Sequence, residues 1–150
     1  MKYIILRAAF LALLGAAPVS LLAQSDYCAV TVNVFGFKNA NGELGVAVFS
    51  SPNGWPEANE KAVFHHEFPI QGDEATAQFT LPPGRYAIAV KHDQNEKEKI
   101  HRNFMGKTKP KEGFGFSNNP EVRHTLPGFE DAAFRVACPS TELSIALNYK

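Results

Sequence analysis

The sequence contains few cysteines, no excess of one charge, and no long apolar run after its N-terminus. It has two cysteines in 150 residues, and 15 basic residues against 15 acidic ones. Two cysteines alone do not make a tetrahedral zinc site, which usually takes four Cys or His ligands. Nucleic-acid binding needs a clustered basic face, and the balanced charge predicts no such partner.

Common catalytic motifs are also missing. The sequence contains no G-x-S-x-G, H-E-x-x-H or nucleotide-binding glycine loop. His65 and His66 are adjacent, and neighbouring residues of a strand point to opposite faces, so the pair does not converge on one site without a bulge. We therefore expect a protein that is not an enzyme, and the sequence predicts no cofactor.

The N-terminus has the layout of a signal peptide. Lys2 and Arg7 precede an apolar run from Ala8 to Ala17, and a short stretch ends at Ala23. The apolar part is interrupted and shorter than the roughly 20 residues that span a bilayer. We predict a signal peptide over 1–23 and one mature domain over 24–150, located in the periplasm or secreted, with no membrane span after cleavage. Cleavage leaves 13 basic residues against 15 acidic ones, a net charge of −2.

Export changes the interpretation of Cys28 and Cys138. An oxidising compartment favours a disulfide between them over two buried free thiols. Closing so long a loop stabilises a folded chain by roughly 4–5 kcal/mol in the chain-entropy model.

Alternation of apolar and polar residues dominates the chain from Tyr27 onward, which is typical of strands. No amphipathic helix of ten or more residues is evident; only residues 57–61 suggest a short helical turn. The pattern predicts an all-β, seven-stranded antiparallel β-sandwich with one long loop over 92–130. The predicted strands are 30–35, 44–50, 62–70, 75–81, 86–90, 133–137 and 143–149.

The predicted loop is the most plausible functional segment, because long loops in compact domains are often functional. It begins at His92-Asp93, directly after the fifth strand. Its residues also have structural interpretations. Asp93 and Asn95 can cap turns, and aromatic side chains can anchor the loop on the sandwich. Ser117, Asn118 and Asn119 can satisfy the exposed backbone of the loop. We favour this structural interpretation. The residues that we assign to a ligand or partner surface are His92, Asp93, Asn95, Asn103, Phe114, Phe116, Ser117, Asn118 and Asn119.

Four stretches, in order, resemble one bacterial family. They are LPPGRYAIAVKHD at 81–93, N-F-x-G at 103–106, EGFGFSNN at 112–119 and LPGFEDAAF at 126–134. They resemble the family catalogued as domain of unknown function 2141. The resemblance implies a small exported β-sandwich, similar in class to transthyretin-like (prealbumin-like) and carboxypeptidase regulatory domains. It implies no known activity.

The segment after the fifth strand departs from the pattern that the resemblance implies. Members typically have an acidic, Asn-rich stretch there that is similar to a calcium loop. In this chain Lys97, Glu98 and His101 stand where Asn, Gly and Asp are usual. Calcium takes six to eight oxygen ligands. These replacements therefore favour a loop held by hydrogen bonds over a calcium site.

Two hypotheses for function follow. The favoured one is a non-catalytic cell-envelope module that binds a partner protein or a small ligand through the 92–130 surface. The alternative is a metal-dependent binding protein or hydrolase that uses His92, Asp93, His101 and Glu112. For a metal, the weak candidate ligands are Asp93, Asn95, His101 and Glu112.

Overall fold

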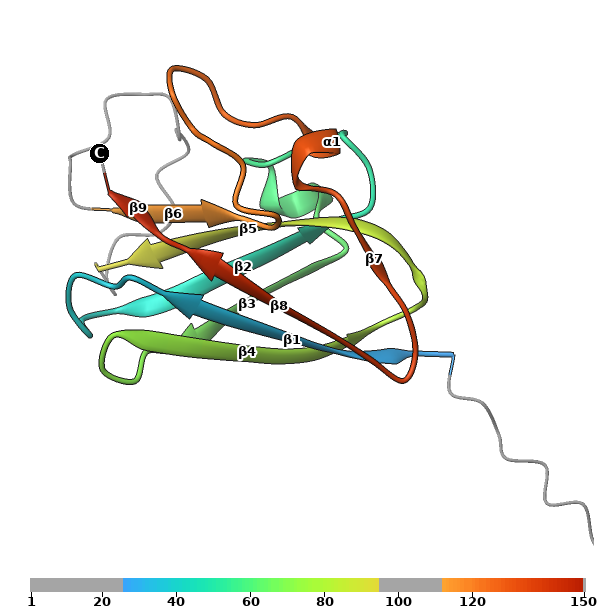
Figure 1. Cartoon of the computed structure of the whole chain (residues 1–150), viewed down its shortest axis with the longest axis horizontal. Coiled ribbons are helices and arrows are strands. Elements are labelled where there is room, and N and C mark those ends of the chain that lie inside the picture. Colours follow the sequence, from blue (N-terminus) through green and yellow to red (C-terminus); the bar gives the residue numbers. More distant parts are fainter. Residues whose placement is uncertain (1–25, 95–111, 150) are drawn as a thin grey trace, which may run out of the picture.

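The protein is an all-β sandwich of two sheets, as the alternation predicts. The structure, a computed structural model, describes residues 26–94 and 112–149. Sheet A has the strand order β4-β1-β8, and sheet B has the order β3-β2-β5-β6-β9, with β7 paired to the start of β5 (Figure 1). The strands are β1 (Cys28–Phe35), β2 (Glu43–Phe49), β3 (Phe64–Pro69), β4 (Glu74–Leu81), β5 (Gly84–Asp93), β6 (Gly113–Phe116), β7 (Phe134–Val136), β8 (Ser140–Ala146) and β9 (Asn148–Tyr149).

The two helices are short. A 3-10 turn, η1, spans Asn59–Lys61, inside the helical turn expected at 57–61, and α1 spans Phe129–Ala132. Within the ranges 26–94 and 112–149, neither has the length and apolar composition that crossing a membrane requires. The predicted signal peptide, residues 1–23, lies outside the described residues.

The strand count and pairing differ from the expectation in three ways. The segment 92–130 is not one loop, because β5 continues to Asp93, β6 lies within it and α1 begins before its end. The expected last strand is two strands, since Leu147 lies between β8 in sheet A and β9 in sheet B. β1 and β8 pair in parallel, whereas we expected only antiparallel pairs.

Close approach of β8 and β9 explains the Gly-Phe alternation of β6. A Cβ on Gly115 would lie 2.6 Å from the carbonyl oxygen of Ala146, and one on Gly113 would lie 2.5 Å from the Tyr149 ring. β6 therefore needs glycine at both positions. Because β6 contains no β-branched residue, its composition does not indicate a strand.

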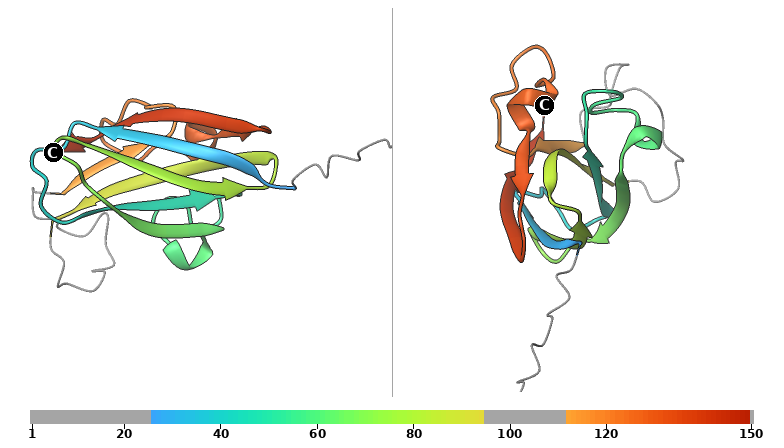
Figure 2. Two further views of the ribbon diagram at one scale, coloured as in Figure 1. Left: turned by 90° about the horizontal axis from the view of Figure 1, so that it is seen from below. Right: turned by 90° about the vertical axis from the view of Figure 1, so that its right-hand side faces the viewer.

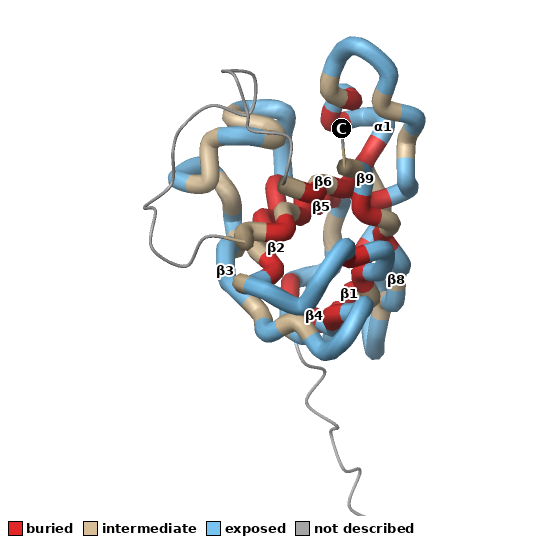
Figure 3. The backbone as a smooth tube through the Cα atoms, turned by 90° about the vertical axis from the view of Figure 1, so that its left-hand side faces the viewer, coloured by how far each residue is buried: buried red, intermediate tan, exposed pale blue. Residues whose placement is uncertain are grey.

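The inner core fills the space between the two sheets. It consists of alternate residues of β1, β2, β4 and β5, mainly Val, Leu, Ile and Ala (Figure 3). Cys28 lies in this core and forms the predicted disulfide with Cys138 (S–S 2.01 Å). The bond joins the start of β1 to the connection between β7 and β8, which confirms the pairing.

A second apolar cluster covers the outer face of sheet B. The residues beneath are small, namely Ala47 on β2 and Ala87 and Ala89 on β5. Aromatic side chains pack around them, from the ends of β2 and β6, from α1 and from the segment 50–62. We call Phe49, Trp55, Phe116 and Phe129 the aromatic cover.

Candidate functional site

His92 lies at the end of β5 with its ring pointing inward, and it is fully buried. Its inward position continues the alternation of Tyr86, Ile88 and Val90. The ring contacts Phe37 edge-on, with centroids 5.0 Å apart. Because no part of the side chain reaches solvent, His92 does not belong to an exposed ligand surface in this structure.

Both ring nitrogens of His92 form hydrogen bonds. Nε2 lies 2.7 Å from the carbonyl oxygen of Asn41, which only accepts, so Nε2 donates in this bond. Nδ1 lies 2.6 Å from the Tyr149 hydroxyl. The same hydroxyl accepts a hydrogen bond from the backbone N–H of Lys38. Burial raises the pKa of Tyr149, so its hydroxyl keeps its proton at neutral pH. His92 thus joins the turn after β1, the end of β5 and the C-terminal strand β9.

Of the other residues of the metal hypothesis, the two that the structure describes, Asp93 and Glu112, are not brought to His92. Asp93 is the next residue of β5 and points to the opposite face. Glu112 forms an ion pair with Lys91, with Nζ and Oε2 3.0 Å apart. Asn95, His101 and Asn103 lie outside the described residues. In the described part of the chain, no three His, Cys, Asp or Glu side chains are grouped so that they could hold a metal ion.

His65 and His66 also diverge. In the register of β2 with β3, His65 lies opposite Ala47, which faces outward, and His66 opposite Val46, which faces the core. His65 shares a hydrogen bond with Asn59. His66 contacts the Phe68 ring. These contacts agree with the expectation that adjacent strand residues point apart.

The Ser117–Asn119 turn follows β6, and its side chains bind backbone groups of three other elements. The buried Ser117 hydroxyl accepts the N–H of Ile88 (2.9 Å) and donates to the carbonyl of Ala132 (2.5 Å). Asn118 donates to the carbonyl of Ala133 (2.8 Å). Asn118 and Asn119 both have positive φ, which Asn tolerates better than most residues.

Asn119 binds the edge of β8 as a neighbouring strand would. Its Nδ2 donates to the carbonyl of Ser144 (2.9 Å), and its Oδ1 accepts the N–H of Ala146 (2.8 Å). The turn therefore connects β5, α1 and β8, and its side-chain amides and hydroxyl are engaged with the backbone. This is the structural interpretation that the sequence favoured.

The aromatic cover lies beneath the next segment, which we call the 120–127 loop. Trp55 contacts Phe49, Phe116 and Phe129, with ring centroids 5.5 to 6.1 Å apart. Its indole Nε1–H donates to the carbonyl of Pro127 (2.9 Å), which ties the segment 50–62 to this loop. Phe114, another predicted site residue, is half-buried and packs against Phe116.

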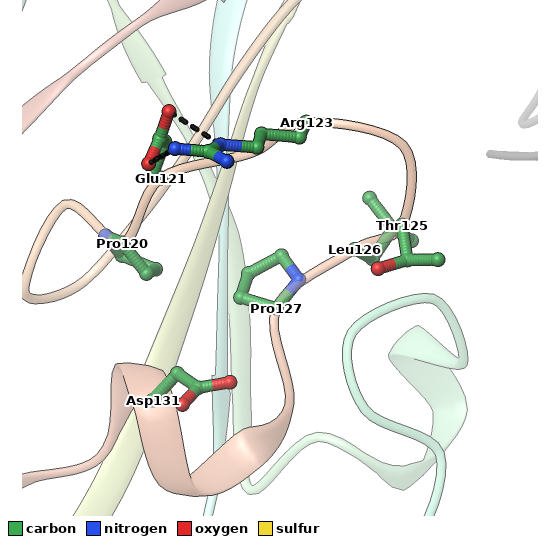
Figure 4. A pocket seen from close by; sticks show the side chains of 7 residues that line it. All are labelled: Pro120, Glu121, Arg123, Thr125, Leu126, Pro127 and Asp131. Atoms are coloured by element: carbon green, nitrogen blue, oxygen red, sulfur yellow. Dashed lines mark hydrogen bonds and ion pairs between the residues drawn. The ribbon is translucent and has the colours of Figure 1, made fainter.

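The outward side of the 120–127 loop is polar. Glu121, Arg123, His124 and Thr125 are exposed, whereas Val122 and Leu126 pack against the cover. The Arg123 guanidinium forms two hydrogen bonds with Glu121, at 2.7 and 2.9 Å. Figure 4 shows this pair beside Pro120, with Pro127 and Asp131 across the hollow.

Two shallow hollows flank this loop. One, of about 490 Å³, lies between the loop and Asp131 of α1. The other, of about 360 Å³, lies between Asn119, Val122 and the residues Ala146 and Asn148 near the C-terminus. Together with the exposed side chains they form an open surface on the described part of the predicted segment.

Two pairs of charged residues have shifted pKa values. One lies beside α1, and the other joins β2 to β3. Arg85 forms a two-pronged contact with Glu130 of α1, which lowers the pKa of Glu130. A hydrogen bond with Glu67 raises the pKa of Glu43, helped by burial and by the charges of Glu67 and Asp93. Both pairs are exposed, so water screens their contribution to stability.

Sequence reasoning missed Trp55 and the small strand residues beneath it. The signal was present: Ala47, Ala87 and Ala89 occupy the outward positions of otherwise large-residue strands. Apolar outward positions indicate a second buried face, which needs a cover from elsewhere in the chain.

The comparisons with known proteins agree with the resemblance seen in the sequence. Residues 32–144, well over half of the chain, match the model of a family described as "Uncharacterized protein conserved in bacteria (DUF2141)". No significant match was found among curated proteins or among solved structures.

Proposed function

This chain belongs to the bacterial family DUF2141, and from that premise we propose that it is an exported, non-catalytic envelope module. It binds a partner protein or a small ligand through the surface of segment 92–130, and within that segment through the 120–127 loop and its two flanking hollows.

The observation that carries this proposal is a loop anchored from beneath and exposed above. Trp55 binds Pro127, and the Ser117–Asn119 turn binds three neighbouring elements. Glu121, Arg123 and Thr125 nevertheless remain exposed. An irregular loop that is already held in one conformation loses little conformational entropy when it binds. The binding free energy is therefore not reduced by the cost of ordering the loop.

The chemistry of the anchoring residues supports binding rather than catalysis. Both ring nitrogens of His92 are engaged in hydrogen bonds. Ser117 uses its hydroxyl to bind backbone groups. Glu112 pairs with Lys91. The two cysteines form a disulfide, so neither is a nucleophile.

The disulfide supports export, since such bonds persist in oxidising compartments. The test is cell fractionation followed by N-terminal sequencing of the native protein. We expect release by osmotic shock or recovery from the medium, with Gln24 as the first residue. Recovery from the cytoplasm with residues 1–23 intact would contradict the export proposal.

Photo-crosslinking in the native bacterium tests the binding surface. A photoreactive residue placed at Thr125 should give discrete adducts, detected as shifted bands. The matched control carries the same residue at Asp73, which is exposed in the turn between β3 and β4. Discrete adducts at 125 and their absence at 73 support a protein partner.

A small ligand is tested with the same two positions. Purified protein is titrated with envelope metabolite fractions while the amide signals of residues 121–126 and 73 are followed. Saturable changes confined to 120–127 support the proposal. If neither crosslinks nor saturable changes distinguish the two positions, the proposed surface is wrong.

A further inference from the structure

The outward face of sheet A carries mainly small and polar side chains. Its three strands lie side by side, and the segments that carry η1 and α1 lie beyond them, on the side of sheet B (Figure 2, left). The register places outward residues in four rows across β4, β1 and β8. The rows are Thr80-Ala29-Ser140, Gln78-Thr31-Glu142, Thr76-Asn33-Ser144 and Glu74-Phe35-Ala146.

Hydroxyl and amide groups dominate this face, and some of them are already oriented. Thr76 donates to Oδ1 of Asn33 (3.1 Å), and Nδ2 of Asn33 donates to Oε1 of Glu142 (2.7 Å). These bonds cross all three strands. They hold the Asn33 amide in one orientation while the neighbouring hydroxyls of Thr31 and Ser144 extend the row of hydrogen-bonding groups.

Phe35 stands at one end of the same face. Its side chain is 44% exposed, although the residue lies in a regular strand. Its neighbours in the row are Glu74 and the small residue Ala146. An exposed ring beside planar polar side chains offers an apolar platform next to hydrogen-bonding groups.

The charges of the face restrict what it can bind. Among these outward residues none is Lys, Arg or His, and the two charged ones, Glu74 and Glu142, are acidic. Phosphate- or carboxylate-rich polymers need cationic groups, so this face repels them. Protein interfaces concentrate aromatic residues and Arg, whereas Ser and Ala are depleted there. The composition therefore does not fit a second copy of this chain.

We propose that the outward face of sheet A binds an uncharged glycan strand that lies along β1. The pyranose hydroxyls exchange hydrogen bonds with Thr31, Asn33 and Gln78. The apolar C–H face of one sugar stacks on Phe35. Strand side chains on one face repeat about every 6.6 Å along a strand and about 4.8 Å across strands, which is a regular array suited to a repeating polymer.

The test is a titration of the purified protein, labelled with ¹⁵N, with two uncharged hexamers. One is the β-1,4 hexamer of N-acetylglucosamine and the other is the β-1,4 hexamer of glucose. We expect saturable changes in the amide signals of Thr31, Asn33 and Gln78 with at least one of them. A hexamer of galacturonate, which is anionic, should give none.

Variants separate recognition from folding. Phe35→Ala and Gln78→Ala change exposed side chains, and each should weaken binding by about tenfold. Thr125→Ala, on the 120–127 loop, should leave sugar binding unchanged. Thermal unfolding of each variant verifies that the domain is intact, so a loss of binding reports on the face itself.

Four outcomes overturn the inference. They are the lack of a saturable change with both uncharged hexamers, equal binding of the galacturonate hexamer, and sugar-induced changes confined to residues 120–127. The fourth is a set of changes on sheet A that follows protein concentration without sugar, which would assign the face to self-association. The third outcome would support the proposed function of the 120–127 loop, and the other three leave it untouched.

Discussion

The two faces of β2 and β5 are packed in different ways. Toward sheet A the strands present large aliphatic residues, including Val46, Val48 and Ile88, which are fully buried. Toward the outside they present Ala47, Ala87 and Ala89, and large aromatic residues pack around these alanines. The inner face packs against the strands of sheet A, whereas the outer face packs against α1 and the segment 50–62, with Phe49 and Phe116 of sheet B between them.

The two faces therefore have different roles: the inner face stabilises the domain, and the outer face supports the 120–127 loop. The inner core joins both sheets and includes the disulfide through Cys28. The aromatic cover joins only sheet B to segments 50–62 and 117–133, and it supports the 120–127 loop. Damage to the inner core should therefore unfold the domain, whereas damage to the cover should release the loop and leave the sandwich folded.

The largest effect is expected from removal of the disulfide. Cys28→Ser combined with Cys138→Ser frees a loop with a sequence separation of 110 residues. The chain-entropy model gives a loss of about 4–5 kcal/mol in the free energy of unfolding. Urea denaturation of wild type and double variant measures it, with Ser51→Ala as a control for handling. Unchanged denaturation midpoints would show that the bond does not hold the inner core.

Ile88→Ala should cost about 3 kcal/mol, since it opens a cavity in the middle of the inner core. The loss should appear in equilibrium unfolding followed by circular dichroism, with all parts of the domain affected together. Val63→Ala, at an exposed residue, is the matched control and should change stability by less than about 0.5 kcal/mol. A similar effect of the two variants would contradict the placement of the inner core.

Asn119→Ala should cost about 1–2 kcal/mol, because Ser144 and Ala146 lose their side-chain partners and Ala fits positive φ poorly. Asn53→Ala, another loop asparagine, serves as control. The exchange rate of the Ala146 amide should rise more than that of β1 amides. Equal changes in both would mean that Asn119 does not act on β8 specifically.

Glu43→Gln should have the smallest effect, and one that depends on pH. The raised pKa of Glu43 means that the folded state holds this proton more tightly than the unfolded state. The resulting stabilisation is present below the ordinary carboxyl pKa of 4.5 and is lost as pH rises through the higher folded value. The variant should therefore lose less stability than wild type across that window, as melting temperatures at several pH values would show. Glu74→Gln, on sheet A, is the control; an identical response of both variants would refute the assignment to Glu43.

Local alternation predicted most of the fold, because period-two patterns directly report which face of a strand is buried. β4 begins and ends within one residue of the expectation, and β1 begins two residues before its expected start and ends where expected. Two features depend on partners far away in sequence. The parallel pairing of β8 with β1 is one, and the Gly-Phe strand β6, made possible by the approach of β8 and β9, is the other.

Only part of the candidate site could be predicted, because some of its contacts also depend on partners distant in sequence. The structural role of Ser117, Asn118 and Asn119 followed from their side-chain chemistry, and their backbone contacts agree with it. The burial of His92 could have been read from the inward alternation of Ile88 and Val90, which ends on it. Trp55 could not be placed, because nothing local indicates that its segment packs over Ala87 and Ala89.

Native-state hydrogen exchange of Trp55→Ala tests most directly whether the cover anchors the 120–127 loop independently of the inner core. The account predicts faster exchange of the Gly128 and Asp131 amides, which are hydrogen-bonded beside the cover. The amides of Val30, Val32 and Val34 should keep wild-type protection. Equal loss of protection in both groups would mean that cover and core unfold as one unit, and would contradict the account.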